Sequence, residues 1–285
     1  MSGDVTEQAL LLGPRRSLVA VVSQSRDADA ATRPTVVILN SGIVHRVGAN
    51  RLNVRWARSL ASRGYHAVRF DLSGLGDSEP RTDALEPLDA ALADIREALD
   101  TLEASRGANR FILGGLCSGA DHSVFYAPDD PRVGGAVLLD PTFPPPLRQY
   151  LHHYKSRLLE RESWLNVIRG KNPLGQALRG KRPSAPPSPD APVEERKVTD
   201  PDVRAILEGG YRRLVDRKIP LLAVLTGERW YYREALLDAF PKVPFGEALR
   251  LEYFPDADHV FSARGERDRL LRLLTDWTSD AASRA

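Results

Sequence analysis

The sequence lacks several features that are typical of particular protein classes. The first is cysteine: its 285 residues contain only one. A single cysteine excludes an intrachain disulfide framework, and no Cys/His cluster has the spacing of zinc ligands. No apolar run approaches the roughly 20 residues that span a bilayer. Residues 1–8 lack the basic region and long apolar core of a secretory signal. We therefore expect a cytoplasmic protein that needs no metal or cofactor and does not enter a membrane.

The chain also lacks a large charge of one sign. It has 40 basic and 38 acidic side chains, for a net charge of +2. This balance gives no overall reason to expect a nucleic-acid partner. The length and the 42% hydrophobic content are sufficient for one large core. We expect a single α/β domain.

Strand-like and helix-like patterns alternate along most of the chain. A hairpin is predicted over residues 9–24, where turn residues separate two apolar runs. Short apolar or β-branched runs predict buried strands at 35–39, 66–71, 111–116, 137–140, 220–225 and 249–254. Helical spacing lies between them, at 49–64, 87–105, 202–217 and 233–240 and at the C-terminus. This alternation predicts an α/β fold with a mostly parallel sheet covered on both faces.

Residues 143–218 interrupt the alternation. They contain three consecutive prolines, an amphipathic stretch from Leu147 to Ile168 and a polar, proline-rich linker near 183–192. We interpret them as an inserted helical cap, so that the core consists of residues 1–142 and 219–285. Across 143–182 there are nine Lys/Arg and two Glu. This basic excess is either a solvated face or a docking surface for an acidic partner, with Tyr150, Tyr154 and Trp164 lining an acyl channel.

The strand predicted at 111–116 runs into the most informative motif of the chain. Gly115-Leu-Cys117-Ser118-Gly119 matches the G-x-Nu-x-G turn that presents a nucleophile between a strand and a helix. Cys117 is at its centre, and a base nearby together with a helix start would favour its thiolate. Two alternatives stay open: Cys117 is an inert buried thiol, or Ser118 is the nucleophile, which would put Leu116 and Ala120 at the small flanking positions.

This turn, the segment Ser41-Gly42-Ile43, the Asp71-x-x-Gly74-x-Gly76-x-Ser78 turn and a late His259 together resemble the α/β-hydrolase superfamily. The likeness covers residues 35–142 and 219–280. With a cysteine nucleophile, the chain resembles dienelactone hydrolases and the aminoacyltransferases and Dieckmann-type cyclases that act on carrier-protein thioesters. Residues 39–48 and the Gly115-Leu-Cys-Ser run are also similar to exosortase-associated hydrolases.

The resemblance implies a set of roles. His259 would be the general base, and the backbone amides of Ile43 and Ser118 would form the oxyanion hole. The acid that orients His259 usually follows the strand at 220–225, where this chain has Thr226-Gly227-Glu228 and no aspartate. Asp140 ends the preceding strand, a position that some members use; we favour Asp140 and keep Glu228 as the alternative. His45, beside the oxyanion segment, makes either a substrate contact or a structural hydrogen bond.

These observations predict an enzyme that opens an ester or thioester through an acyl-enzyme on Cys117. Thioester exchange is close to thermoneutral, and a thioester reacts more readily with amines and carbanions than with water, so transfer or cyclisation of a carrier-bound acyl or aminoacyl group is the main hypothesis. The basic cap would then dock an acidic acyl or peptidyl carrier protein. A simple esterase or thioesterase with the same Cys-His-Asp triad is the alternative. A noncatalytic hydrolase-fold binding protein also stays open.

Overall fold

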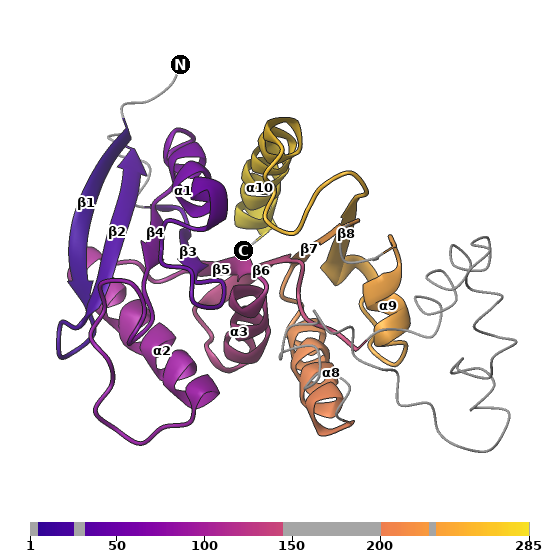
Figure 1. Ribbon diagram of the computed structural model, residues 1–285, viewed down its shortest axis with the longest axis horizontal. Coiled ribbons are helices and arrows are strands. Elements are labelled where there is room, and N and C mark those ends of the chain that lie inside the picture. Colours follow the sequence, from indigo (N-terminus) through magenta and orange to yellow (C-terminus); the bar gives the residue numbers. More distant parts are fainter. Residues whose placement is uncertain (1–4, 26–31, 145–200, 228–231, 285) are drawn as a thin grey trace, which may run out of the picture.

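A computed structural model describes residues 5–25, 32–144, 201–227 and 232–284. Eight strands form one sheet in the order β1-β2-β4-β3-β5-β6-β7-β8 (Figure 1). Strands β3 to β8 are parallel to one another, whereas β2 is antiparallel to β1 and β4. The strands are β1 Val5–Leu12, β2 Leu18–Ser25, β3 Thr35–Leu39, β4 Ala67–Phe70, β5 Phe111–Leu116, β6 Val133–Leu139, β7 Leu221–Thr226 and β8 Leu249–Phe254.

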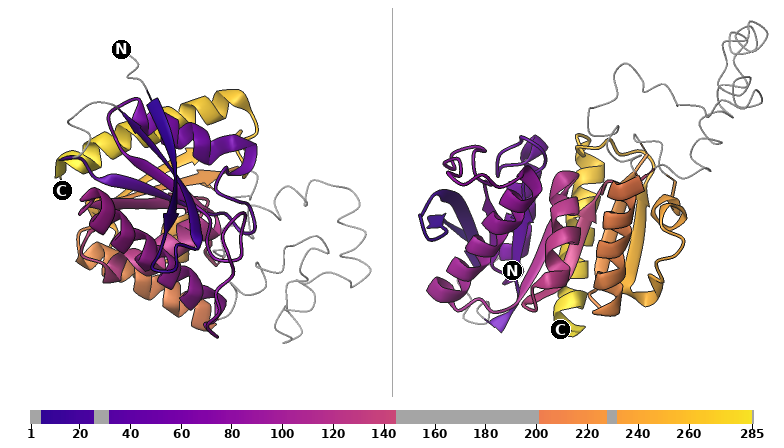
Figure 2. Two further views of the ribbon diagram at one scale, coloured as in Figure 1. Left: turned by 90° about the vertical axis from the view of Figure 1, so that its left-hand side faces the viewer. Right: turned by 90° about the horizontal axis from the view of Figure 1, so that it is seen from below.

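Helices cover both faces of the sheet (Figures 1 and 2). On one face α1 (Leu52–Ala61) packs against α10 (Arg264–Arg284). The other face carries α2 (Pro87–Arg106), α3 (Ser118–Tyr126) and α8 (Pro201–Asp216), with the short α9 (Ala235–Ala239) contributing to the same core cluster. Short 3-10 helices occupy Ala49–Arg51, Ala127–Asp129 and Gly246–Ala248. The predicted α/β fold, with a mostly parallel sheet between helices, is confirmed.

The central strands are apolar throughout because helices lie over both faces of the sheet. Every residue of β3, β5 and β7 is buried. Alternate side chains of these strands enter two separate clusters, one under α1 and α10 and one under α2, α3 and α8. Continuous apolar runs are typical of such doubly covered parallel strands. The two clusters fix where each strand ends, and therefore where the loops that follow the strands meet.

Most of the predicted cap, including the basic and aromatic residues proposed for docking, lies outside the described residues. Its C-terminal helix, α8, is described and packs on α3. Leu207, Tyr211 and Leu214 of this helix are buried in the same cluster as the sheet. In this respect α8 packs as part of the helical layer of the core. The division of the chain into core and cap stays a prediction.

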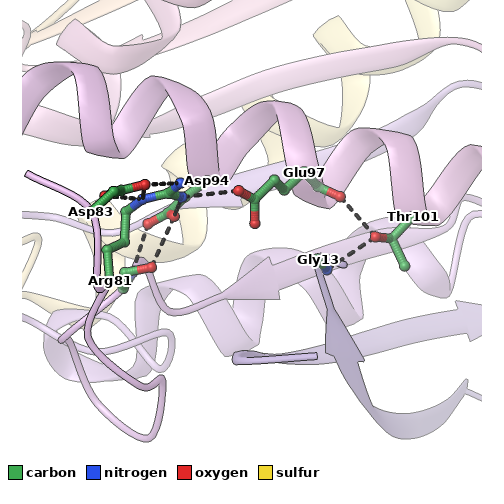
Figure 3. Close-up of polar contacts among 7 residues, drawn as sticks. Gly13, Arg81, Asp83, Asp94, Glu97 and Thr101 are labelled. Atoms are coloured by element: carbon green, nitrogen blue, oxygen red, sulfur yellow. Dashed lines mark hydrogen bonds and ion pairs between the residues drawn. The ribbon is translucent and has the colours of Figure 1, made fainter. Parts of the chain in front are cut away.

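The segment that follows β4 is tied to α2 by a partly buried ion network (Figure 3). Arg81 bridges Asp83, Asp94 and Glu97 at 2.7–3.0 Å. Asp94 also accepts hydrogen bonds from the backbone N–H and the hydroxyl of Ser73. On the next turn of α2, Thr101 accepts the Gly13 N–H of the β1–β2 turn at 3.0 Å. Because Asp94 is 1% exposed, its charge depends on these partners.

A second ion cluster joins the antiparallel edge of the sheet to α1. Glu7 on β1 accepts hydrogen bonds from Arg58 of α1, from Arg69 of β4 and from Ser23 of β2. The hydrogen bond from Arg58 is the largest influence on the Glu7 carboxyl; burial opposes it, Arg69 and Ser23 reinforce it, and the pKa falls from 4.5 to about 2. A carboxyl whose pKa is depressed in the folded state stabilises the fold above its unfolded pKa.

We expect Glu7→Gln to lower the free energy of unfolding at pH 7 by about 1–2 kcal/mol, after allowance for solvent screening of a side chain that is 24% exposed. The deficit should shrink as the pH falls from 4.5 towards 2, because the carboxyl of the unfolded chain binds its proton over this range while the native carboxyl stays ionised until about pH 2. Urea unfolding curves across this range measure both effects. Asp276→Asn, in an exposed pair with Arg63, is the control and should change stability by less than about 0.5 kcal/mol. A deficit independent of pH would contradict the assignment.

Candidate active site

The turn after β5 holds Cys117 in a strained conformation. Its φ of 54° and ψ of −119° lie outside the regions that L-residues prefer, and α3 begins at the next residue. The Cys117 N–H donates to the Leu139 carbonyl, and the Ala120 and Asp121 N–H groups donate to the Cys117 carbonyl. Cys117 is 8% exposed and is not part of a disulfide. A nucleophile elbow has this strand–turn–helix geometry.

Glycines on both sides let the elbow approach the neighbouring backbone. A Cβ on Gly115 would lie 2.8 Å from the Cα of Gly119, and a Cβ on Gly119 would lie 2.6 Å from the carbonyl oxygen of Asn40. Real Cβ atoms do not come so close. The motif therefore needs its two glycines for contact across the turn. With Gly115 and Gly119 in these places, the central position of the turn belongs to Cys117.

Asp140 follows β6 and is fully buried, with a φ of 42°. Its carboxylate accepts the Thr226 N–H at 2.7 Å and the Thr226 hydroxyl at 2.5 Å. The Nδ1 atom of His259 lies 2.8 Å from Asp140 Oδ2. These contacts supply the partners that a buried carboxylate needs. The residues predicted as acid and base are thus hydrogen-bonded to each other, and their catalytic roles stay predictions.

The loop after β8 brings His259 to Asp140 across the end of β7. It comes so close to Gly227 that a Cβ there would lie 2.0 Å from the Pro255 carbonyl oxygen. Asp258 accepts hydrogen bonds from the backbone N–H and hydroxyl of Ser262. Burial would raise the pKa of the Asp258 carboxyl, but the Ser262 hydrogen bonds outweigh it and lower that pKa. Asp258 therefore stabilises the loop, while the carboxylate hydrogen-bonded to the His259 ring is that of Asp140.

These residues meet at the carboxyl edge of the sheet. β5 and β6 are adjacent parallel strands whose last residues, Leu116 and Leu139, pair in register. Cys117 and Asp140 follow directly. Cys117 also shares an apolar cluster with Ala257 and Phe261, which flank His259. Ligand and active sites of open α/β sheets occur at this edge.

The predicted oxyanion segment lies beside the elbow. A bridge joins Ser41 to Val44, and Gly42 between them has a φ of 51°. The Gly42 N–H donates to the Ser118 hydroxyl at 2.7 Å, and the Ile43 side chain at the tip is 90% exposed. Since a helix leaves its first N–H groups without intrahelical acceptors, the start of α3 at Ser118 directs amide dipoles towards Cys117. The roles of the Ile43 and Ser118 amides remain predictions.

Asp140 bonds Thr226 and His259, and neither His45, which the sequence singled out, nor His122 joins that pair. His45 Nδ1 accepts the Val47 N–H at 3.4 Å, which is a local structural contact. Burial lowers the pKa of His122 on α3 to about 4, which keeps it neutral near pH 7. The alternative acid Glu228 lies outside the described residues.

Sequence reasoning missed three contacts that support the site. Thr226 donates two hydrogen bonds to Asp140, Asn40 donates to the Val44 carbonyl of the oxyanion segment, and Asp71 accepts the Arg46 N–H. Thr226 lies at the strand end where the resemblance leads one to expect an acid. This position was the sequence signal that could have indicated its contact with Asp140. Among the described residues, no group of three or more His, Cys, Asp or Glu side chains is placed to hold a metal ion. None of the described helices is long and apolar enough to cross a membrane.

The sheet order, the elbow and the carboxyl-edge site define an α/β-hydrolase fold. A family model for the serine aminopeptidases, S33, matches residues 32–204, which is more than half of the chain. The protein therefore belongs to the serine aminopeptidase S33 family of α/β-hydrolases. None of the curated proteins matches the sequence.

Several solved structures share the fold. Est1E from Butyrivibrio proteoclasticus is 14% identical, with a TM-score of 0.62 over 96% of this chain and 99% of that one. A dienelactone hydrolase from Anabaena variabilis is also 14% identical, with a TM-score of 0.59 over 98% and 99%. An α/β serine hydrolase homologue from Coxiella burnetii is 16% identical, with a TM-score of 0.55 over 97% of each chain. At these identities the likeness shows the fold alone.

The elbow glycine provides a test of this packing. We expect Gly119→Ala to destabilise the protein by about 1–3 kcal/mol, because the new methyl group must displace the Asn40 backbone. Gly209→Ala is the matched control: it adds a methyl group in the middle of α8 with nothing within 4 Å, and should stabilise by about 0.5–1 kcal/mol. Thermal unfolding of both variants measures the contrast. Equal effects would show that the turn has room for a side chain.

Proposed function

We propose that the protein opens an ester or thioester through an acyl-enzyme on Cys117, with His259 as general base and acid and Asp140 as the group that orients His259. The observation that carries the proposal is the 2.8 Å contact between His259 and the buried Asp140, at the same sheet edge as the strained Cys117 turn. A base held by a buried carboxylate next to a nucleophile elbow is the arrangement that acyl transfer needs.

The first half-reaction follows from this geometry. If Nδ1 of His259 carries the proton shared with Asp140, Nε2 is left as the acceptor for the thiol proton. The thiolate adds to the carbonyl carbon, and the oxygen becomes an oxyanion that the Ile43 and Ser118 amides would stabilise. When the oxyanion collapses, the alcohol or thiol leaves with the proton that His259 had taken. The product is an acyl group in thioester linkage to Cys117.

For the second half-reaction we propose transfer or cyclisation of a carrier-bound acyl or aminoacyl group, because a thioester reacts more readily with amines and carbanions than with water. The basic excess across residues 143–182 supports an acidic carrier protein as partner. We propose that the insert between β6 and α8 forms the cap on which it docks.

Hydrolysis by the same triad is the second candidate. It is favoured by the family, which is described as serine aminopeptidases, and by the fold relative named as a dienelactone hydrolase. A noncatalytic binding protein has less support, because binding alone gives no reason to bury a carboxylate against His259. The two enzymatic candidates differ in what removes the acyl group from Cys117. If the acyl-enzyme is hydrolysed in water alone, the protein is a hydrolase; if it loses the acyl group only when an amine or a carrier protein is added, the protein is a transferase.

Covalent trapping tests the nucleophile. Incubation with p-nitrophenyl acetate or with a short acyl thioester of N-acetylcysteamine should add one acyl group, and peptide mass spectrometry should locate it on Cys117. Cys117→Ala should abolish the adduct and reduce turnover by about 1,000-fold or more, because no other thiol is present. An adduct on Ser118 would assign the serine instead. Failure to trap any adduct across pH 6–9 would overturn the catalytic proposal.

Substitution of the two candidate acids tests the triad. Asp140→Asn should lower kcat about 1,000- to 10,000-fold, because the amide cannot hold His259 in the required tautomer or stabilise the imidazolium. Thr226→Val, which removes one of the hydrogen bonds to Asp140, should lower kcat only about tenfold. Glu228→Gln is the control and should leave kcat unchanged, with circular dichroism confirming that each variant folds. If Glu228→Gln alone abolishes turnover, the acid assignment is wrong.

A further inference from the structure

The oxyanion segment, residues 41–46, is anchored at its base by buried polar side chains. Asn40, 1% exposed, donates from Nδ2 to the Val44 carbonyl at 2.9 Å and accepts the Leu72 N–H at 2.9 Å. Its amide therefore joins the end of β3 to the end of β4. A buried amide satisfied on both sides holds its backbone neighbours in one arrangement.

Asp71, fully buried at the end of β4, is the second anchor. Its carboxylate accepts the backbone N–H of Arg46 and forms an ion pair with the guanidinium of the same residue. The Asp77 N–H reaches the second carboxylate oxygen at 3.2 Å. Gly76 packs so close that a Cβ would lie 2.3 Å from that oxygen. Both ends of the segment are thus fixed to the sheet.

The tip of the segment is tied to the elbow instead. Gly42 is exposed, and a Cβ on it would meet nothing within 4 Å, so side-chain packing does not position this residue. Its N–H donates to the hydroxyl of Ser118 at 2.7 Å. The next residue is Ile43, whose amide is the one expected to face an oxyanion. The Ser118 side chain, next to Cys117 in the chain, therefore holds Gly42, the residue that precedes the Ile43 amide.

We propose that the Ser118 hydroxyl is a positioning group of the active site: by accepting the Gly42 N–H, it fixes the distance between the Ile43 amide and a carbonyl bound at Cys117. This inference rests on the proposed function, since the position of the amide matters only if an oxyanion forms. It assigns to the Ser118 side chain a role separate from that of its backbone amide, which any residue at position 118 would supply.

The test separates the effect of losing the Ser118 hydroxyl from any effect of the substitution on folding. Ser118→Ala removes the acceptor and keeps the amide, whereas Ser118→Thr keeps both. With p-nitrophenyl acetate, Ser118→Ala should lower kcat for acylation about 10- to 100-fold with less than about a threefold change in KM, because an oxyanion contact acts mainly in the transition state. Ser118→Thr should restore kcat to within about threefold of the wild type. Ser123→Ala is the matched control, since Ser123 lies on the same helix and its hydroxyl donates to the Gly119 carbonyl within that helix.

A second readout reports on the oxyanion site directly. A simple aldehyde such as butyraldehyde adds to the Cys117 thiol, with carbon bonding to sulfur and the proton moving to oxygen, so that the hemithioacetal oxygen occupies the oxyanion position. Ser118→Ala should weaken aldehyde inhibition by about the same factor as it lowers kcat. The aldehyde should inhibit the Ser118→Thr and Ser123→Ala variants as strongly as it inhibits the wild type.

The inference and the proposed function fail in different ways. Absence of any acyl adduct on the wild-type protein overturns the proposed function and this inference with it. An active wild type with Ser118→Ala equal to Ser123→Ala in kcat and in aldehyde inhibition overturns the positioning role alone. A loss in Ser118→Ala that Ser118→Thr does not restore, or a change in KM in place of kcat, also overturns it.

Discussion

The site depends on how closely the turn at Cys117 approaches the end of β3. At Gly119 the separation is so small that a methyl group would lie 2.6 Å from the Asn40 carbonyl oxygen. The same turn forces Cys117 to a positive φ, a conformation that costs a residue with a side chain on the order of 1–3 kcal/mol. Hydrogen bonds from Cys117 to the end of β6, and from α3 back to Cys117, hold it there. This close approach is also what brings Ser118 within reach of Gly42.

Asp140 has a comparable function on the other side of the site. Its backbone N–H donates to Val224 of β7, its carboxylate accepts two hydrogen bonds from Thr226, and His259 after β8 completes the set. One buried side chain thus ties together three consecutive strands of the sheet. An acid at the end of β7 would lie on the strand next to β8, and so beside the loop that carries His259. With the proposed acid, Asp140, after β6, the loop after β8 must cross the end of β7 to reach it, and the close contact at Gly227 is what allows that crossing.

The sequence predicted the elements well wherever burial produces a periodic pattern. Strands at 35–39, 111–116 and 249–254 have their predicted bounds. The first two are buried between two apolar layers, whereas the third is the half-buried edge strand. For β6 the sequence indicated only the end of the strand, at 137–140; the strand begins at Val133, and Gly134 and Gly135 interrupt the apolar pattern of its first half. Gly135 lies beneath Ile112 and Trp277, where a Cβ would come within 3.3–3.4 Å of either, so a small residue is packed there for tertiary reasons. Single-sequence periodicity does not register such contacts.

The site was predictable only in part, for a related reason. Cys117 can be recognised because it lies at the centre of a local sequence motif. His259 can be recognised because it lies late in the chain, in the loop after the last predicted strand. The contacts of Asn40, Asp71 and Thr226 depend on which strands are neighbours. Asp71 meets Asn40 because β4 lies beside β3, and Thr226 meets Asp140 because β7 lies beside β6. Asp71 was recognised as part of a turn motif, but its contact with Arg46 crosses 25 residues and needed the sheet order.

The cysteine at the elbow of a serine aminopeptidase family member has a consequence for the proposed chemistry. The supporting parts, a histidine held by a buried carboxylate and amides at a helix start, serve a thiol and a hydroxyl alike, because they act on the proton and on the developing oxyanion. Replacing oxygen by sulfur therefore leaves the route to the acyl-enzyme unchanged. It changes the intermediate from an ester to a thioester, which reacts more readily with amines and carbanions than with water. On this argument the choice between hydrolysis and transfer depends on what reaches the acyl group at Cys117, and not on the triad.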